Sequence, residues 1–196
     1  MKKLFEGYQQ FRKKYATGDY SVMQTLSQHG QKAEIMIIAC CDSRVDPAVL
    51  LQCDPGKLFV VRNIANIIPP YEKDEKHHGT SAALEFAVRF LNIKNLIILG
   101  HSQCGGIQTL LSQCNLYQND FITNWVSLIE NKNNQHTDVD SYAKKAVLQS
   151  YDHALEFPWI KEKVQAETLT IHRWFFDIAT GTISAYSDKD MMYKNL

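Results

Sequence analysis

The sequence has no excess of charge of either sign. Its 196 residues include 21 lysines and arginines and 21 aspartates and glutamates, so the formal net charge is zero. Proteins that bind nucleic acid normally carry a basic excess, and chains that bind acidic membrane surfaces carry clusters of lysine and arginine. The balance therefore argues against nucleic acid and against a membrane as partners.

Long hydrophobic runs and linkers are also missing. No stretch of 18 apolar residues occurs, so we expect no transmembrane helix. The first ten residues lack the apolar segment of a secretory signal, which predicts a cytoplasmic protein. No repeat or Gly/Ser-rich tract divides the chain. We therefore predict a single domain over residues 31–196, preceded by a helical arm over residues 1–30.

Cysteine is scarce, and its number is odd. The five cysteines are Cys40, Cys41, Cys53, Cys104 and Cys114. In a cytoplasmic chain such a set is more typical of metal ligands or reactive thiols than of a disulfide framework. The glycine-rich motifs that cradle phosphates are absent as well, so nothing in the sequence supports nucleotide binding.

The predicted arm, residues 1–30, has a helical pattern of apolar side chains. They recur at spacings of three and four on one face, at Leu4, Phe5, Tyr8, Phe11 and Tyr15. Such a face packs either on the chain's own core or on another subunit. The pattern by itself leaves both alternatives open.

Short apolar runs alternate with helical segments along the rest of the chain. Strands are predicted at 35–39, 57–61 and 96–99, and a closing hairpin at 168–176 and 182–187. Helices are predicted at 48–52, 81–91, from Gly105 onward, and over 121–163 with a polar break at 131–140. This order predicts an α/β fold: a mainly parallel sheet with helices on both faces and an antiparallel strand at the C-terminus.

Residues suited to binding a metal follow two of the predicted strands. Cys40 and Cys41 come at the end of the first strand, and His101 and Cys104 follow the third. Ligands gather at the carboxyl ends of parallel strands, so these segments should meet. Two sulfurs and one nitrogen suit Zn²⁺, and three protein ligands leave the open position of a catalytic site. The alternative is a closed site, with a further thiol such as Cys41, in which zinc only holds the fold or an assembly together.

The choice between Cys40 and Cys41 rests on side-chain alternation. If the segment is extended, Cys40, Asp42 and Arg44 lie on one side and Cys41 lies on the other. Binding through Cys40 would place a carboxylate and a guanidinium beside the metal, where the carboxylate can orient a water and the guanidinium can hold the carboxylate. Binding through Cys41 would leave Asp42 without a role, so Cys40 is favoured.

These segments resemble the β-class carbonic anhydrases. The resemblance rests on Cys40-Cys41-Asp42-Ser43-Arg44-Val45 and on Gly100-His101-Ser102-Gln103-Cys104-Gly105-Gly106, which match the family's C-x-D-S-R and H-x-x-C zinc motifs. It continues through residues 59–66, 79–86 and 174–181, and it covers roughly residues 30–187.

The resemblance implies a zinc enzyme that reversibly hydrates carbon dioxide to bicarbonate and a proton. It implies zinc ligation by Cys40, His101 and Cys104, with Asp42 and Arg44 as a catalytic pair. It also implies substrate contacts from Gln31, Phe59, Phe86 and the backbone of Gly105. The family forms dimers and larger homo-oligomers, which favours an arm that packs on another subunit.

Two resting states are known in the family that the chain resembles. Asp42 either pairs with Arg44, which leaves the site open, or binds the metal itself, which closes it. The branch prone to closure carries a tryptophan three residues before the first cysteine ligand, where this chain has Ile37. We therefore predict an open site. Two other functions remain: a non-catalytic zinc module for assembly or regulation, and a related hydrolase that acts on a linear substrate such as carbon disulfide.

Overall fold

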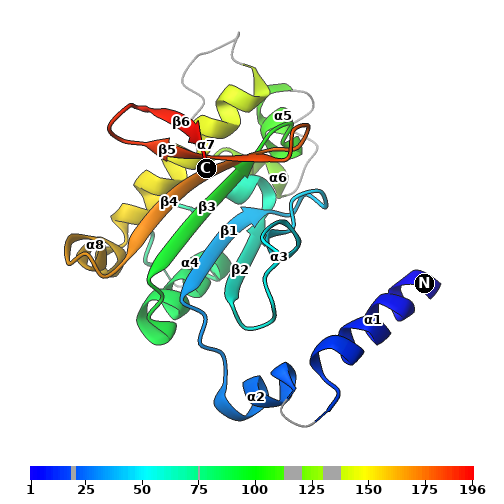
Figure 1. Cartoon of the computed structure of the whole chain (residues 1–196). Coiled ribbons are helices and arrows are strands. Elements are labelled where there is room, and N and C mark those ends of the chain that lie inside the picture. The colour runs from blue at the N-terminus through cyan, green and yellow to red at the C-terminus, as the bar shows by residue number, and fades with distance from the viewer. Residues whose placement is uncertain (19–20, 75, 113–120, 130–137) are drawn as a thin grey trace.

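The protein is built on one twisted sheet. The computed structural model describes residues 1–18, 21–74, 76–112, 121–129 and 138–196. The strands are β1 (Ile35–Cys40), β2 (Leu58–Asn63), β3 (Asn95–His101), β4 (Thr170–Asp177), β5 (Thr182–Ser187) and β6 (Met192–Asn195). Their order in the described part of the sheet is β2-β1-β3-β4-β5-β6. Pairing is parallel from β2 to β4 and antiparallel for β5 and β6 (Figure 1), which confirms the predicted fold class.

The central strands are apolar on both faces because both faces are covered. Residues 36–40 of β1 and 96–101 of β3 are all buried. Met36 and Ile38 point into the larger core, whereas Ile37 and Ala39 point into a second core on the opposite face. A strand between two apolar layers has no polar side to show, which is why these runs lack the alternation of half-exposed strands.

The helices cover the two faces unequally. They are α1 (Lys2–Tyr15), α2 (Val22–His29), α3 (Pro47–Leu50), α4 (Gly79–Glu85), α5 (Gly105–Ser112), α6 (Ile122–Val126), α7 (Val139–Glu156) and α8 (Pro158–Gln165), with the short turns η1 (Ile64–Asn66) and η2 (Phe86–Leu91). Residues of α4, η2, α7 and α8 form the larger core on one face. Four-residue α3 packs on the other, where Leu50 joins the second core.

Several predicted elements differ in their limits. The pattern over residues 1–30 forms two helices, because the chain turns at Gly18, with φ +90°, and α2 begins again at the Ser21 cap. The helix predicted at 81–91 begins at Gly79 and becomes π-helical after Glu85. Most of the predicted break at 131–140 lies outside the described residues, and α7 already begins at Val139.

The last strand, β6, was not predicted. It pairs antiparallel with β5 through a turn that holds Met191 at φ 55°. The sequence of this turn lacks glycine, and the strand is short and mostly exposed. Neither a turn signal nor an apolar period therefore marks it.

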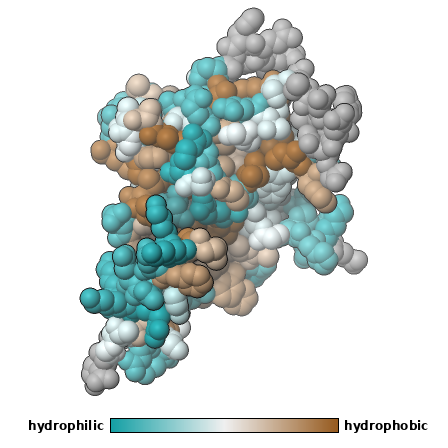
Figure 2. Space-filling model, turned by 90° about the vertical axis from the view of Figure 1, so that its right-hand side faces the viewer, coloured by the Kyte–Doolittle hydropathy of each residue, from teal (hydrophilic) through white to brown (hydrophobic). Residues whose placement is uncertain are grey.

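Helix α1 projects away from the sheet (Figure 1). Within the described chain neither α1 nor α2 has a buried residue, and Leu4 is 69% exposed and Tyr8 59%. Only the C-terminal end of α1 touches the body, where the Tyr15 hydroxyl donates to Asp54 at 2.6 Å. Figure 2, which views the molecule from the side toward which α1 projects, shows apolar residues between polar ones at the surface. Leu4, Phe5 and Tyr8 of the apolar stripe are thus not packed on the chain's own core.

No helix in the described ranges is both long enough and apolar enough to cross a membrane.

Candidate metal centre

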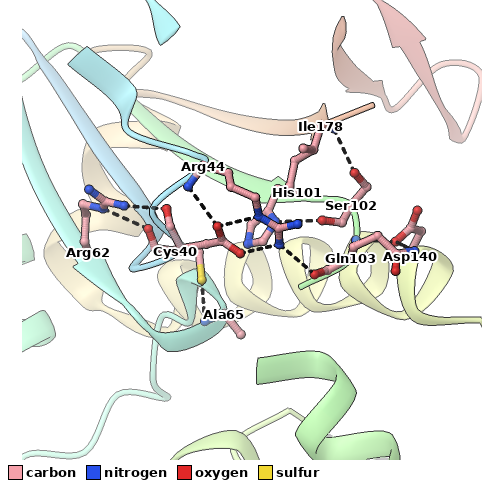
Figure 3. Close-up of polar contacts among 10 residues, drawn as sticks. Cys40, Arg44, Arg62, Ala65, His101, Ser102, Gln103, Asp140 and Ile178 are labelled. Atoms are coloured by element: carbon pink, nitrogen blue, oxygen red, sulfur yellow. Dashed lines mark hydrogen bonds and ion pairs between the residues drawn. The ribbon is translucent and has the colours of Figure 1, made fainter. Parts of the chain in front are cut away.

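Three potential ligands meet at the carboxyl ends of neighbouring parallel strands. Cys40 is the last residue of β1 and His101 the last of β3 (Figure 3). Cys104 directly precedes α5. Their ligand atoms all lie within 4.8 Å of one another, and all three residues are buried. Among the described residues these are the groups that could share one ion. The meeting follows from the register, which places Ala39 beside Leu99 in adjacent strands.

The imidazole of His101 is oriented by its backbone. Its Nδ1 lies 2.9 Å from the Ser102 carbonyl oxygen, so Nδ1–H donates there and Nε2 keeps its lone pair. Nε2 is buried and has no hydrogen-bond partner among the described residues. A buried nitrogen without a partner is costly unless it serves as a ligand. The donor set therefore fits a zinc ion held by Cys40, His101 and Cys104.

The two buried thiols shift each other's pKa in opposite directions. The hydrogen bond with Cys104 lowers the pKa of Cys40 to about 4, with further help from the imidazole and from the backbone N–H of Ala65. The same contact with Cys40, together with burial, raises the pKa of Cys104. The Ala65 N–H lies 3.4 Å from the Cys40 sulfur. A thiolate at Cys40 is the form that binds metal.

Close packing brings Ala65 to the cluster. Ala65 lies in the η1 turn after β2 with φ 62°. A Cβ on Gly106 would come within 2.6 Å of Ile64 and 3.1 Å of the Ala65 Cβ. Glycine at 106 thus lets α5 approach η1, so that three strand ends converge on the cluster.

Asp42 and Arg44 form a pair beside the cluster. The Arg44 guanidinium donates from Nε to Oδ1 at 2.9 Å and from Nη2 to Oδ2 at 2.6 Å. These hydrogen bonds from Arg44 hold the pKa of Asp42 well below its usual value. The predicted reason for their proximity was wrong, because the segment is a turn rather than extended: the Val45 N–H donates to the Asp42 carbonyl at 3.0 Å. The side chains meet across this turn.

Arg62 supports the same turn, a role that the sequence reasoning missed. From β2 it donates to the carbonyl oxygens of Cys40 at 2.9 Å and of Asp42 at 2.7 Å. It also pairs with Asp46 at 2.8 Å, whose other oxygen caps α3. The sequence did hold a signal for this role, because Arg62 is a charged residue at the end of the apolar run of β2. A charged side chain that is partly buried needs polar partners.

Cys41 lies outside the cluster. It is exposed, and it lines an apolar cavity of about 700 Å³ together with Ile64 and Trp125. The Trp125 indole N–H is fixed by the Ile64 carbonyl at 2.8 Å. The geometry therefore favours Cys40 over Cys41 as a metal ligand.

Three of the predicted substrate residues lie apart from the cluster. Phe59 pairs with Met36 near the start of β1, four residues from Asn63, which pairs with Cys40. At 3.3 Å per residue this separation is about 13 Å. Phe86 stacks on Phe59 with ring centroids 5.9 Å apart, and Gln31 precedes β1 at its far end and is exposed. Within one chain the structure does not bring them to the metal site.

Gly105 is the predicted substrate residue that does lie at the cluster. It follows Cys104 directly and begins α5. A Cβ there would meet no atom within 4 Å, so open space lies beside it.

The fold and the cluster define an α/β protein with a two-cysteine, one-histidine metal-binding centre at the strand ends. The family model described as carbonic anhydrase matches residues 35–183. The chain belongs to the carbonic anhydrase family, and its relatives place it in the β class. The family predicted from the two motifs is thereby confirmed.

Known proteins resemble the chain over most of its length. It is 35% identical to the chloroplastic β carbonic anhydrase 5 of Arabidopsis thaliana over 189 residues, which cover 90% of this chain and 62% of that one. It therefore spans less than two thirds of that relative. The structure of the β-carbonic anhydrase CcaA matches with a TM-score of 0.90 at 31% identity, covering 100% of this chain and 99% of CcaA. A tetrameric β-carbonic anhydrase of Sordaria macrospora matches with a TM-score of 0.77 at 29% identity, covering 94% and 92%.

Proposed function

We propose that the protein catalyses the zinc-dependent reversible hydration of carbon dioxide to bicarbonate and a proton. The observation that carries the proposal is the buried Cys40–His101–Cys104 cluster with the Asp42–Arg44 pair beside it. A zinc ion bound there would supply the Lewis acidity that makes water a nucleophile at neutral pH. Family membership supports the same chemistry.

The chain's own residues would orient the reactants. Asp42 is kept ionised by Arg44 and can accept a hydrogen bond from the attacking water. Arg44 holds both oxygens of this carboxylate and thus competes with a metal for it. The arrangement supports the open rather than the closed state.

The apolar cavity lined by Cys41, the residue after Cys40, would suit carbon dioxide. It is lined mainly by apolar side chains, Ile64 and Trp125 among them. Carbon dioxide has no dipole, so an apolar space takes it up without unpaired polar groups. Bicarbonate is charged, and it would leave such a space toward water.

A second copy of the chain completes the substrate pocket in this proposal. Gln31, Phe59 and Phe86 lie far from the cluster of their own chain, and Phe86 is 42% exposed. They would reach a metal site only from another subunit. The tetrameric relative from Sordaria macrospora supports a homo-oligomer. The cytoplasmic location and the domain boundary at residue 30 stay predictions.

Stopped-flow hydration of carbon dioxide by the zinc-loaded protein tests the function, with carbon disulfide as the comparison substrate. We expect rapid hydration of carbon dioxide and little turnover of carbon disulfide. Turnover of carbon disulfide alone would assign the related hydrolase activity. Zinc binding without turnover of either substrate would assign a non-catalytic module.

A further inference from the structure

One residue of the segment from His101 to Cys104, called the metal loop below, has an unusual backbone conformation. Gln103, between His101 and Cys104, has φ 53°, in the left-handed region that side chains other than glycine rarely adopt. Such a residue persists where the surroundings hold it in place. The contacts of its peptide groups therefore show what fixes the loop.

Both the N–H and the carbonyl oxygen of Gln103 form hydrogen bonds, each to a different side chain. Its N–H donates to Oδ1 of Asp140 at 2.7 Å, and its carbonyl oxygen accepts from Nη2 of Arg44 at 3.2 Å (Figure 3). The backbone of Gln103 thus connects a carboxylate on α7 to the guanidinium that holds Asp42.

The carboxylate of Asp140 is not used to cap its own helix. Asp138 is the cap of α7, and its Oδ1 accepts from the N–H groups of Asp140 at 3.1 Å and Ser141 at 3.0 Å. The helix is anchored on the sheet through buried residues such as Ala143 and Val147. Asp140 therefore reaches the metal loop from a firmly packed element.

We propose that Asp140 is a positioning residue for the metal centre. Its carboxylate holds Gln103 in the left-handed conformation, which keeps the Gln103 carbonyl directed at Arg44 and sets the place of Cys104 relative to His101. Without this acceptor the Gln103 peptide relaxes toward the common backbone regions, and Arg44 loses an anchor. The expected effect on kcat for carbon dioxide rests on the proposed function.

The test compares three variants of the full chain. Asp140→Ala removes the acceptor, Asp140→Asn keeps an oxygen at its place, and Asp152→Ala removes an exposed carboxylate further along α7 as the matched control. The readouts are hydrogen exchange of the Gln103 amide by NMR, zinc affinity by chelator competition, kcat and KM for carbon dioxide, and the thermal unfolding midpoint.

Asp140→Ala should accelerate exchange of the Gln103 amide by about tenfold or more, because its acceptor is gone. It should lower zinc affinity or kcat by about 10- to 100-fold, the usual cost of losing a supporting contact at a metal site. KM should change little. Asp140→Asn should lie between this variant and the wild type, and Asp152→Ala should match the wild type throughout.

Unchanged exchange at Gln103 in Asp140→Ala would overturn the proposal. Faster exchange with unchanged zinc affinity and kcat would overturn it too, because the contact would then position nothing. If Asp140→Ala fails to fold, Asp140→Asn gives the comparison. A wild type without hydration activity would refute the proposed function, whereas exchange and zinc affinity would still decide the role of Asp140.

Discussion

The two ends of β1 differ in how complete they are within one chain. At the carboxyl end, Cys40 and His101 are buried, and the Asp42–Arg44 pair is held by Arg62 and Gln103. Beyond the other end, Gln31 and the N-terminal part of the apolar stripe of α1 (Leu4, Phe5 and Tyr8) are exposed, although the sequence predicts contacts for them.

The metal centre and the proposed substrate pocket therefore have different requirements. The metal centre needs only three strand ends of one sheet, and one chain supplies them. In the proposed function the pocket also uses residues that one chain places about 13 Å or more from the cluster. In this interpretation the exposed aromatic side chains form an interface with a second copy of the chain.

Loss of a metal ligand should have the largest effect. Cys104→Ser should lose bound zinc and lower kcat/KM at least about 100-fold, since it removes a ligand rather than a supporting contact. The matched control is Cys41→Ser, which changes an exposed thiol of the same segment. Metal analysis and stopped-flow hydration measure both. A zinc-free Cys41→Ser protein would contradict the assignment of Cys40.

Arg44→Ala should have the next largest effect. The carboxylate of Asp42 loses its cation and becomes free to bind the metal, so kcat should fall about 10- to 100-fold. Arg44→Lys should lose less, because it keeps a charge but not the two-pronged contact. A crystal structure of zinc-loaded Arg44→Ala with Asp42 still off the metal would contradict this explanation.

Dimers that combine two different variants show which chain supplies Gln31 to a metal site. Gln31→Ala and Cys104→Ser should each lower activity when present in all subunits. In a twofold dimer with one chain of each kind, one site carries both defects and the other carries neither, so about half of the wild-type activity should return. Differently tagged, co-purified chains allow this measurement. No recovery would show that Gln31 acts within its own chain.

Removal of residues 1–30 should reduce the oligomer. If the stripe on α1 packs on another subunit, the truncated protein should sediment at about half of the wild-type mass. Leu4→Ser with Tyr8→Ser should act in the same direction, whereas Gln10→Ser on another face of α1 should not. Unchanged sedimentation of the truncated chain would refute the arm interpretation.

The smallest effect concerns stability at acid pH. Because Arg44 lowers the pKa of Asp42 in the folded state, the pair stabilises the fold fully above the unfolded pKa of about 4 and loses this contribution as the pH falls below it. The difference in free energy of unfolding between wild type and Arg44→Ala should therefore shrink below about pH 4. Urea unfolding across this range measures it. A constant difference would show that the pair does not stabilise the fold.

The sequence predicted the elements that depend on short-range patterns. The buried runs of β1 and β3 and the spacing from His101 to Cys104 are local features, and the structure has them. The break between α1 and α2 was missed because the apolar spacing of the first fifteen residues was extended past the turn residue Gly18. Strand β6 was missed because it is short and exposed and leaves little periodicity.

The candidate ligands, the family and five of the six strands could be predicted from the sequence, because motif spacing and apolar runs record them directly. The order of the strands in the sheet could not. Tertiary structure alone decided which groups meet. Parallel pairing brought His101 to Cys40, the turn at Asp42 brought Arg44 to its carboxylate, and packing of α7 brought Asp140 to Gln103. It also separated Phe59 from the metal-binding residues. Distances between residues far apart in sequence depend on how strands and helices pack, and no local pattern contains them.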